Sequence, residues 1–454
     1  FIEKFVVDPR HIEIQVLADK HGTCLYLGER ECSVQRRHQK VIEEAPSPFV
    51  DEELRKAMGE QAVALAKEVD YHSAGTVEFI VGSDKSFYFL EMNTRLQVEH
   101  PVTELITGID LVEQMIRVAY GEKLTLTQED ITLTGWALES RLYAEDPYRG
   151  FLPSIGRLSR YKVPKGDNVR VDTGVTEGSE ITMFYDPMIA KLVTYGATRT
   201  EALEEMGRAL DAYEVKGIAH NINFLNAVCN HPRFKAGELT TGFIAEEYPD
   251  GFHGAPLDAE TYEKLVAVAI LVYARHSSRS LSDVIEKTSE KWIVGNGKES
   301  STEVSAEDAK AGIDVTIGDR VFAVRSKWKP GKRRIKAKVN GDEMIAQLEF
   351  SRGSIRLTHG GAMVELAVRS PSAAKLAELM PVKEAADLSK LLLCPMPGMI
   401  VAVNVSEGDE VKAGQPLAVV EAMKMENILR AEQDGVNAKA GDILAVDDVI
   451  LEFE

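Results

Sequence analysis

One predicted helix of this chain has no face that could point to water. It runs from 257 to about 288, and its middle, LVAVAILVYA, is apolar on every side. The short strand-like runs that follow between 291 and 369 are separated by Gly, Asp and Asn turns, as in an antiparallel barrel or a strongly curved sheet. The sequence therefore predicts a helix enclosed by a β-barrel over residues 251–370.

The residues on either side are predicted to form two further units and a linker. Residues 1–250 alternate strand runs such as HIEIQVL with helical patterns, which indicates a mixed α/β domain. Residues 371–390 are rich in Ala, Ser and Pro, which is typical of a linker of intermediate stiffness. A small β unit follows over 391–454. The predicted fold class is therefore multidomain α+β.

Charge and cysteine content restrict the partners. The formal net charge of −19 at pH 7 argues against nucleic acid and anionic membranes, so an anionic substrate needs a local cluster of Lys and Arg. The four cysteines lack C-x-x-C spacing, so we expect free thiols in a reducing compartment. The longest apolar run is half of the roughly 20 residues that a membrane span needs. The chain opens with FIEKFVVDPR and no Met, and we expect that the start of the protein is absent.

The last unit contains an internal repeat with a lysine at its centre. The segment PMPGMIVAVNVSEGDEVKAGQPLAVVE is echoed by QDGVNAKAGDILAVDDVILEFE, and EAMKMEN at 421–427 lies between the halves. Two such halves related by a quasi-twofold axis make a flattened β-sandwich, with Lys424 at the tip of a hairpin. The second half is four residues shorter between matching glycines, so we expect that a segment is missing between about Gly435 and Asn437.

The stretch EMNTRLQVEHPVTE at 91–104 concentrates polar residues on one strand. Glu91, Asn93 and Arg95 share a face at period two, and a hairpin closed around residues 82–85 is predicted to bring Glu78 diagonally opposite Glu91. Two carboxylates and an amide oxygen suit Mg²⁺ or Mn²⁺ with a nucleotide. On the residues alone, a solvated strand face is the alternative.

Both stretches resemble parts of biotin-dependent carboxylases. The motif A-M-K-M at 422–425 is similar to the biotinyl domain, rather than to the related lipoyl domain, whose lysine usually follows an acidic residue. Residues 1–250 resemble the C-terminal part of an ATP-grasp biotin carboxylase. The resemblance implies that a biotin protein ligase attaches biotin to Lys424, and that ATP, bicarbonate and Mg²⁺ or Mn²⁺ bind in the first unit.

The resemblance also assigns roles to individual residues. Glu99 would be the general base, Arg141 would face the biotin ureido oxygen, and Lys40 would reach bicarbonate and phosphate. On the residues alone, Arg141 could simply be ion-paired with Glu139 or Glu145. The remaining assignments are Glu78, Glu91 and Asn93 for the metal, Glu3, Lys4, His11 and Gln35 for ATP, and Arg95, Gln97 and Val98 for bicarbonate.

The order of the three units resembles the α subunits of acyl-CoA carboxylases. The resemblance is strongest to the propionyl-CoA enzymes, and the 3-methylcrotonyl-CoA enzymes are the alternative. This implies a carboxyltransferase β subunit that binds the middle unit and the acyl-CoA, in an α6β6 assembly, and a bacterial cytoplasm or a mitochondrial matrix. No glycine-rich phosphate loop occurs in residues 1–60, so the chain as written should not cleave ATP. A non-catalytic biotinylated carrier is the alternative of another class.

Overall fold

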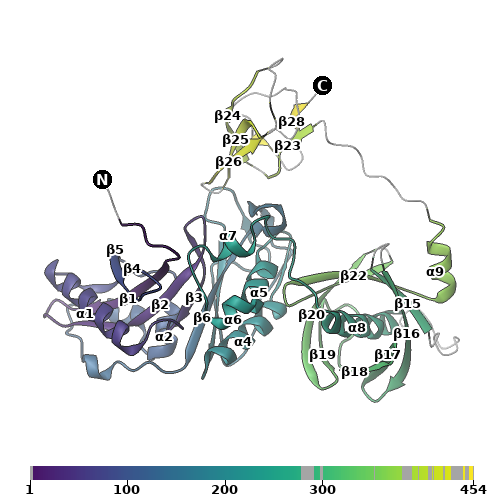
Figure 1. The fold of residues 1–454 in the computed structure, drawn as a ribbon, viewed down its shortest axis with the longest axis horizontal. Coiled ribbons are helices and arrows are strands. Elements are labelled where there is room, and N and C mark those ends of the chain that lie inside the picture. The colour runs from purple at the N-terminus through teal and green to yellow at the C-terminus, as the bar shows by residue number, and fades with distance from the viewer. Residues whose placement is uncertain are drawn as a thin grey trace.

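The structure, a computed structural model, describes residues 4–277, 291–296, 300–351, 353–380, 391–396, 398–406, 412, 414–422, 425–430, 443–444 and 449–452. Figure 1 shows an α/β body at the N-terminal end, a barrel around a helix, and a small β body at the C-terminal end. The multidomain α+β fold is therefore confirmed. Glu3, Lys424 and the segment near Gly435 that we expect to be incomplete lie outside the described residues.

An antiparallel sheet of eight strands, in the order β11-β13-β6-β3-β2-β1-β4-β5, forms the centre of the α/β body. The strands are β1 Arg10–Ala18, β2 Cys24–Arg36, β3 Gln39–Ala45, β4 Ser73–Val81, β5 Phe87–Asn93, β6 Trp136–Tyr143, β11 Val169–Thr173 and β13 Met188–Gly196. Three short pairs flank the sheet: β7 Glu145–Asp146 with β8 Leu152–Pro153, β9 Gly156–Arg157 with β12 Glu180–Ile181, and β10 Arg160–Lys162 with β14 Glu214–Lys216.

Helices cover this sheet on both faces. They are α1 Glu52–Glu68, α2 His100–Thr107, α3 Leu111–Tyr120, α4 Arg199–Ala212, α5 Ile222–Asn230, α6 Pro232–Ala236 and α7 Phe243–Glu247, with 3₁₀ turns at Gln128–Asp130 and Pro147–Arg149. Leu138 and Leu142 of β6 belong to the core under α4 and α5, whereas Ala137 packs in the core with Val102 and Ile106 of α2. Alternate residues of β6 therefore face opposite layers.

The middle unit encloses its helix as predicted. Eight strands close into an antiparallel barrel: β15 Lys291–Asn296, β16 Ser300–Ala309, β17 Gly312–Ile317, β18 Arg320–Ser326, β19 Arg334–Val339, β20 Asp342–Ser351, β21 Ser354–His359 and β22 Ala362–Arg369. The helix α8, Ala259–Ser277, is surrounded by them, and each of Leu265–Val272 is at most 1% exposed. The predicted continuation of this helix to 288 lies outside the described residues.

The barrel contacts the α/β body through polar groups. In the β21–β22 turn, the backbone N–H of Gly360 donates to Asp211 of α4 at 2.9 Å, and His359 lies 2.7 Å from the same carboxylate. Gln347 of β20 donates to the carbonyl of Tyr213 at 2.7 Å. A side chain at Gly361 would overlap the carbonyl of Asn223, so the turn approaches α5 as closely as a glycine allows.

No helix in the described parts of the chain combines the length and hydropathy of a membrane span.

Part of the predicted linker is helical. The helix α9, Pro371–Ala377, begins after Ser370, whose side chain accepts a hydrogen bond from the N–H of Ala373, and Pro371 occupies its first turn. The cap and the alanines that follow favour a helix, so the prediction of a linker without secondary structure does not hold for these residues. Residues 381–390 lie outside the described part.

The last unit has two small sheets over one core. The strands β24 Gly398–Val403, β25 Pro416–Ala422, β26 Met425–Arg430 and β27 Ile443–Leu444 form one sheet, and β23 Leu391–Leu393 pairs with β28 Val449–Glu452. Ile400, Leu417, Val420 and Ile450 pack between them. Ala422 lies opposite Met425, so residues 423 and 424 connect β25 to β26.

Candidate active site

The register of the large sheet aligns four charged residues in a row. Glu13 of β1 lies opposite Arg30 of β2 on one side and opposite Glu78 of β4 on the other, and Glu78 lies opposite Glu91 of β5. The predicted diagonal placement of Glu78 and Glu91 is therefore wrong. The register shifts between Glu78 and Phe79, so that Leu90 is an extra residue in β5 and moves Glu91 directly across from Glu78.

Arg30 anchors this row inside the sheet. Its guanidinium is fully buried and donates to Glu13 at 2.5 Å, to Gln15 at 2.6 Å and to Gln97 at 2.7 Å. Gln97 in turn donates to Glu78 at 2.7 Å. The sequence analysis missed Arg30 and Glu13. The signal was present in HIEIQV, where polar residues alternate with isoleucine inside a strand that the fold buries on both faces.

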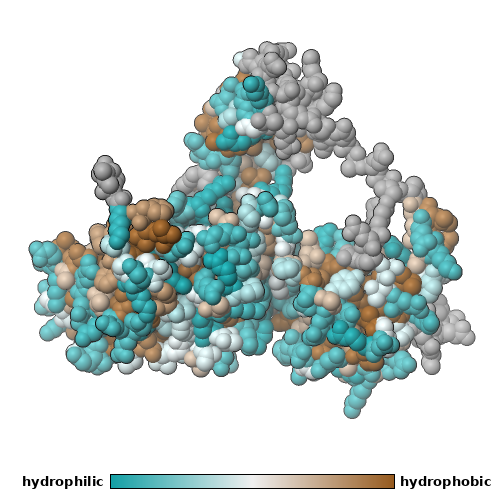
Figure 2. Space-filling model, in the orientation of Figure 1, coloured by the Kyte–Doolittle hydropathy of each residue, from teal (hydrophilic) through white to brown (hydrophobic). Residues whose placement is uncertain are grey.

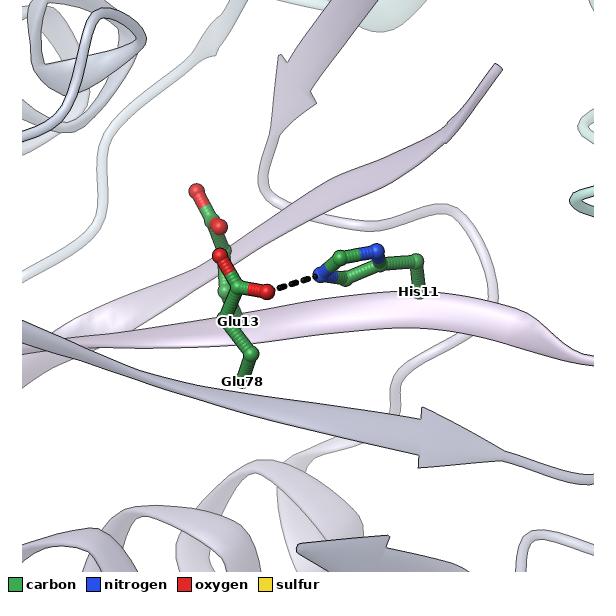
Figure 3. Close-up of side chains that lie close together, drawn as sticks. All are labelled: His11, Glu13 and Glu78. Carbon is green, nitrogen blue, oxygen red and sulfur yellow. Dashed lines mark ion pairs between the residues drawn. The ribbon is translucent and has the colours of Figure 1, made fainter. Parts of the chain in front are cut away.

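Lys40 brings three carboxylates together. Its Nζ lies 2.6 Å from Glu13, 2.7 Å from Glu99 and 3.1 Å from Glu78. Burial would lower the pKa of Lys40, but the three carboxylates raise it above its usual value, so the ammonium stays charged. His11 lies 2.9 Å from the second oxygen of Glu78 (Figure 3). The predicted basic residue thus binds to the predicted general base and to a predicted metal ligand.

Glu78, Glu91 and Asn93 converge as a possible cation site. The Asn93 amide nitrogen donates to Glu78 at 3.1 Å and to Glu91 at 3.0 Å, so both carboxylates reach one point. The Asn93 carbonyl oxygen accepts from Arg95 at 3.1 Å. Rotation of that amide by half a turn would present three oxygen ligands, which is the donor set that Mg²⁺ and Mn²⁺ prefer. The residues therefore fit the metal that the sequence implied.

Arg141 joins the general base to the sheet. Its guanidinium lies 2.5 Å from Glu43 of β3 and 2.9 Å from Glu99, which precedes α2. Neither Glu139 nor Glu145 is its ion-pair partner, since Glu145 pairs with Arg36 at 2.8 Å. Sequence proximity suggested the wrong acids because the partners come from strands and loops that lie alongside β6. The backbone carbonyl of Val98 accepts from Lys191 at 2.7 Å.

A cleft of about 370 Å³ gathers most of the predicted site residues. Its lining consists of His11, Arg37, His38, Gln39, Lys40, Glu78, Glu91, Asn93, Arg95, Gln97, Val98, Glu99 and Arg141. Gln35 stands behind it and bonds to Nδ1 of His11 at 2.8 Å. Lys4 lies outside the cleft and donates to the hydroxyl of Tyr88.

Hydrophobic surface gathers by the N-terminal segment and β5 (Figure 2), where Phe5, Phe89 and Leu90 are exposed.

Glu13→Gln is expected to destabilise the α/β body more at pH 7 than at pH 3. Burial would raise the pKa of Glu13, but Arg30 and Lys40 lower it from 4.5 to about 2. The carboxylate therefore adds stability above about pH 4.5, and this is lost as the pH falls toward 2. The loss at pH 7 should be on the order of 3 kcal/mol.

Urea unfolding midpoints at both pH values measure this effect. Glu204→Gln, at an exposed position of α4, is the control and should shift neither midpoint. An equal loss at pH 3 and pH 7 in Glu13→Gln would contradict the lowered pKa.

Family models match the chain in four segments. They are described as carbamoyl-phosphate synthase L chain, ATP binding domain, over residues 1–127; biotin carboxylase C-terminal domain over 139–246; propionyl-coenzyme A carboxylase BT domain over 265–383; and biotin-requiring enzyme over 390–453. The matches follow the order of the three bodies of the fold.

Solved structures resemble the α/β body. The biotin carboxylase domain of 2-oxoglutarate carboxylase from Hydrogenobacter thermophilus, in complex with MgADP, ADP and bicarbonate, is 48% identical, with a TM-score of 0.53 over 54% of both chains. The complete pyruvate carboxylase of Rhizobium etli is 40% identical, with a TM-score of 0.55 over 60% of this chain and 27% of that one.

Curated relatives cover the whole chain. The propionyl-CoA carboxylase alpha chain of Ruegeria pomeroyi is 55% identical over 100% of this chain and 71% of its own length. The human mitochondrial propionyl-CoA carboxylase alpha chain is 47% identical over 100% of this chain, which spans 64% of that relative. The mitochondrial methylcrotonoyl-CoA carboxylase subunit alpha of Dictyostelium discoideum is 41% identical over 96% of this chain. The chain belongs to the family of propionyl-CoA carboxylase alpha chains.

Proposed function

We propose that the whole protein uses ATP and bicarbonate to carboxylate biotin attached to Lys424, and delivers the carboxyl group to a β subunit that converts propionyl-CoA to methylmalonyl-CoA. The observation that carries this proposal is the cleft in which Lys40, Glu99 and Arg141 meet the Glu78 and Glu91 carboxylates. The related carboxylase domain that binds MgADP and bicarbonate supports it. The activity is that of an ATP-dependent ligase.

The residues of the cleft have different roles in the proposed reaction. Glu99 removes the proton of bicarbonate, which Arg95, Gln97 and the backbone of Val98 orient. Arg141 donates to the ureido oxygen, where negative charge develops, and Lys40 compensates the charge of bicarbonate and phosphate. Glu78, Glu91 and Asn93 would hold a Mg²⁺ or Mn²⁺ ion, which would supply positive charge to the ATP phosphates. Glu3, Lys4, His11 and Gln35 would bind ATP, as the sequence resemblance implies.

The carrier unit moves the product to a second site. Biotin attached to Lys424 would supply the ureido nitrogen that holds the carboxyl group, and a biotin protein ligase would attach it within the A-M-K-M motif. We assign residues 1–250 to carboxylation, 251–370 to binding of the β subunit, 371–390 to the linker and 391–454 to the carrier. The match over 265–383 to the BT domain supports the second assignment.

The acyl substrate and the compartment are proposed from the relatives. Propionyl-CoA is preferred to 3-methylcrotonyl-CoA because identity to the relatives named for it reaches 55%, against 41% for the methylcrotonoyl relative. A bacterial cytoplasm or a mitochondrial matrix is proposed as the compartment, since relatives of both origins occur. The proposed assembly with the β subunit is α6β6, as the sequence resemblance implies.

Release of ADP that depends on biotin and bicarbonate tests the proposed activity in the whole protein. Activity is the expected result, and its absence from correctly folded protein would leave a carrier without catalysis. Co-purification with the β subunit, followed by assays with propionyl-CoA and 3-methylcrotonyl-CoA, tests the choice of substrate.

Glu91→Gln should weaken the use of metal-bound nucleotide before any carboxyl transfer. Glu91 adds a negative charge to the possible cation site, and the amide keeps its shape while removing that charge. The Mg²⁺ concentration at half-maximal ADP release should therefore rise. Glu113→Gln, on the exposed surface of α3, is the control. An unchanged Mg²⁺ dependence in Glu91→Gln would show that Glu91 is no ligand.

A further inference from the structure

Two fully buried carboxyl groups stand behind Arg141 in the sheet. Glu43 of β3 lies directly opposite Glu139 of β6, and both side chains are 0% exposed. Directly opposed residues in antiparallel strands have Cβ atoms about 5 Å apart, so the two carboxyl groups are within reach of each other. Val193 lies opposite Glu139 on the other side of the row, and Ala45 and Ala137 form the next row, so the surroundings under α2 are apolar.

Three of the four carboxyl oxygens of this pair lack a partner. Glu43 Oε1 accepts from Nε of Arg141 at 2.5 Å. Within the described part of the chain, Glu43 Oε2 and both oxygens of Glu139 have no hydrogen-bond partner. Two ionised carboxylates at this depth would face the cost of burial and repel each other, whereas one proton between them satisfies two of the three free oxygens.

The neighbouring charges do not remove the need for this proton. Lys191 of β13 lies opposite Arg141 in the register and is bonded to Val98 and Asp172. From α2, His100 bonds to the carbonyl of Gln97, and Glu104 pairs with Arg170. Burial raises the pKa of Glu139 well above its usual value and that of Glu43 above 4.5, and the neighbouring Glu43 carboxyl raises the pKa of Glu139 further.

We propose that Glu139 is a positioning residue that keeps a proton at neutral pH and shares it with Glu43, so that a single negative charge holds Arg141 from behind. This inference rests on the proposed function of Arg141 in carboxylation. Arg141 lies between Glu43 inside the sheet and Glu99 at the cleft. A second charge inside the sheet would draw the guanidinium away from the cleft. The neutral acid thus keeps Arg141 aimed at the reacting oxygen.

Infrared spectroscopy tests the shared proton without any reaction. Near pH 7, exposed carboxyl groups are ionised, so a carboxylic acid C=O band reports buried acids. The acid band of Glu139→Gln should be weaker than that of the wild type. The exposed control Glu204→Gln should have a band of wild-type intensity. Because Glu139→Gln could fail to fold, Glu43→Gln is a second variant. It leaves Arg141 free to pair with Glu139, and the Glu139 acid band should vanish at a lower pH than in the wild type.

The pH profile of free biotin carboxylation tests the positioning role. Loss of the proton withdraws Arg141, so the wild-type kcat should fall on the alkaline side, and Glu139→Gln, which cannot ionise, should move that fall to higher pH. An identical acid band in wild type and Glu139→Gln, or an identical alkaline limb, would overturn the inference. The two tests can also give different answers. If the acid band depends on Glu139 but the protein never carboxylates biotin, the shared proton is supported and the proposed function is overturned.

Discussion

Lys424→Arg should abolish biotinylation of the whole protein. The ligase joins the biotin carboxyl group to a lysine Nζ as an amide, and a guanidinium keeps the positive charge but offers no amine that can be acylated. Lys424 is the only lysine of this sequence that stands within an A-M-K-M motif. A streptavidin blot should therefore change from positive to blank.

The same variant separates the two half-reactions. Carboxylation of propionyl-CoA should be lost with the carrier, whereas carboxylation of free biotin should continue, because the cleft residues belong to the α/β body. Lys412→Arg changes an exposed lysine of the same unit and serves as the matched control. A positive blot in Lys424→Arg, or propionyl-CoA carboxylation without attached biotin, would disprove the carrier assignment.

The local signals of the sequence predicted elements better than partners. The apolar core of α8 required an enclosing barrel, and the strand alternation of Glu91 and Asn93 indicated one polar face, because burial and the period of a strand are properties of neighbouring residues. The predicted place of Arg95 on the same strand is wrong, since β5 ends at Asn93, although Arg95 still lines the cleft. The bulge at Leu90 could not be predicted, since the register between two strands depends on the whole sheet.

Pairing across strands was the part that sequence proximity misassigned. Arg141 is bonded to Glu43, which is 98 residues away, rather than to Glu139, two residues away on its own strand. Arg30 was missed because its partners come from β1, β4 and the segment before α2. Buried charges are stable only with such partners, so a charged residue at an inward position of a strand is itself a signal of a distant ion pair.

Arg141→Ala should slow carboxylation of free biotin by about 100-fold in the whole protein, which is the typical cost of losing one donor to a developing oxyanion. The guanidinium acts where negative charge appears on the ureido oxygen, so kcat should fall more than the affinity for ATP. Arg141 is bonded to Glu43 and Glu99 and not to the ATP-side ligands Glu78, Glu91 and Asn93, so nucleotide binding should stay nearly unchanged.

The structure adds a second consequence to this variant. Arg141→Ala leaves the carboxylates of Glu43 and Glu99 without a shared cation, so it should also destabilise the α/β body by about 3–5 kcal/mol. Arg170→Ala is the matched control, because it breaks two ion pairs, with Glu104 and Asp172, outside the cleft. It should lower stability without the 100-fold loss. A group that acts at the reacting oxygen lowers the rate by more than its effect on stability explains. Wild-type rates in folded Arg141→Ala, or an equal loss of rate in Arg170→Ala, would therefore show that Arg141 takes no part in the reaction.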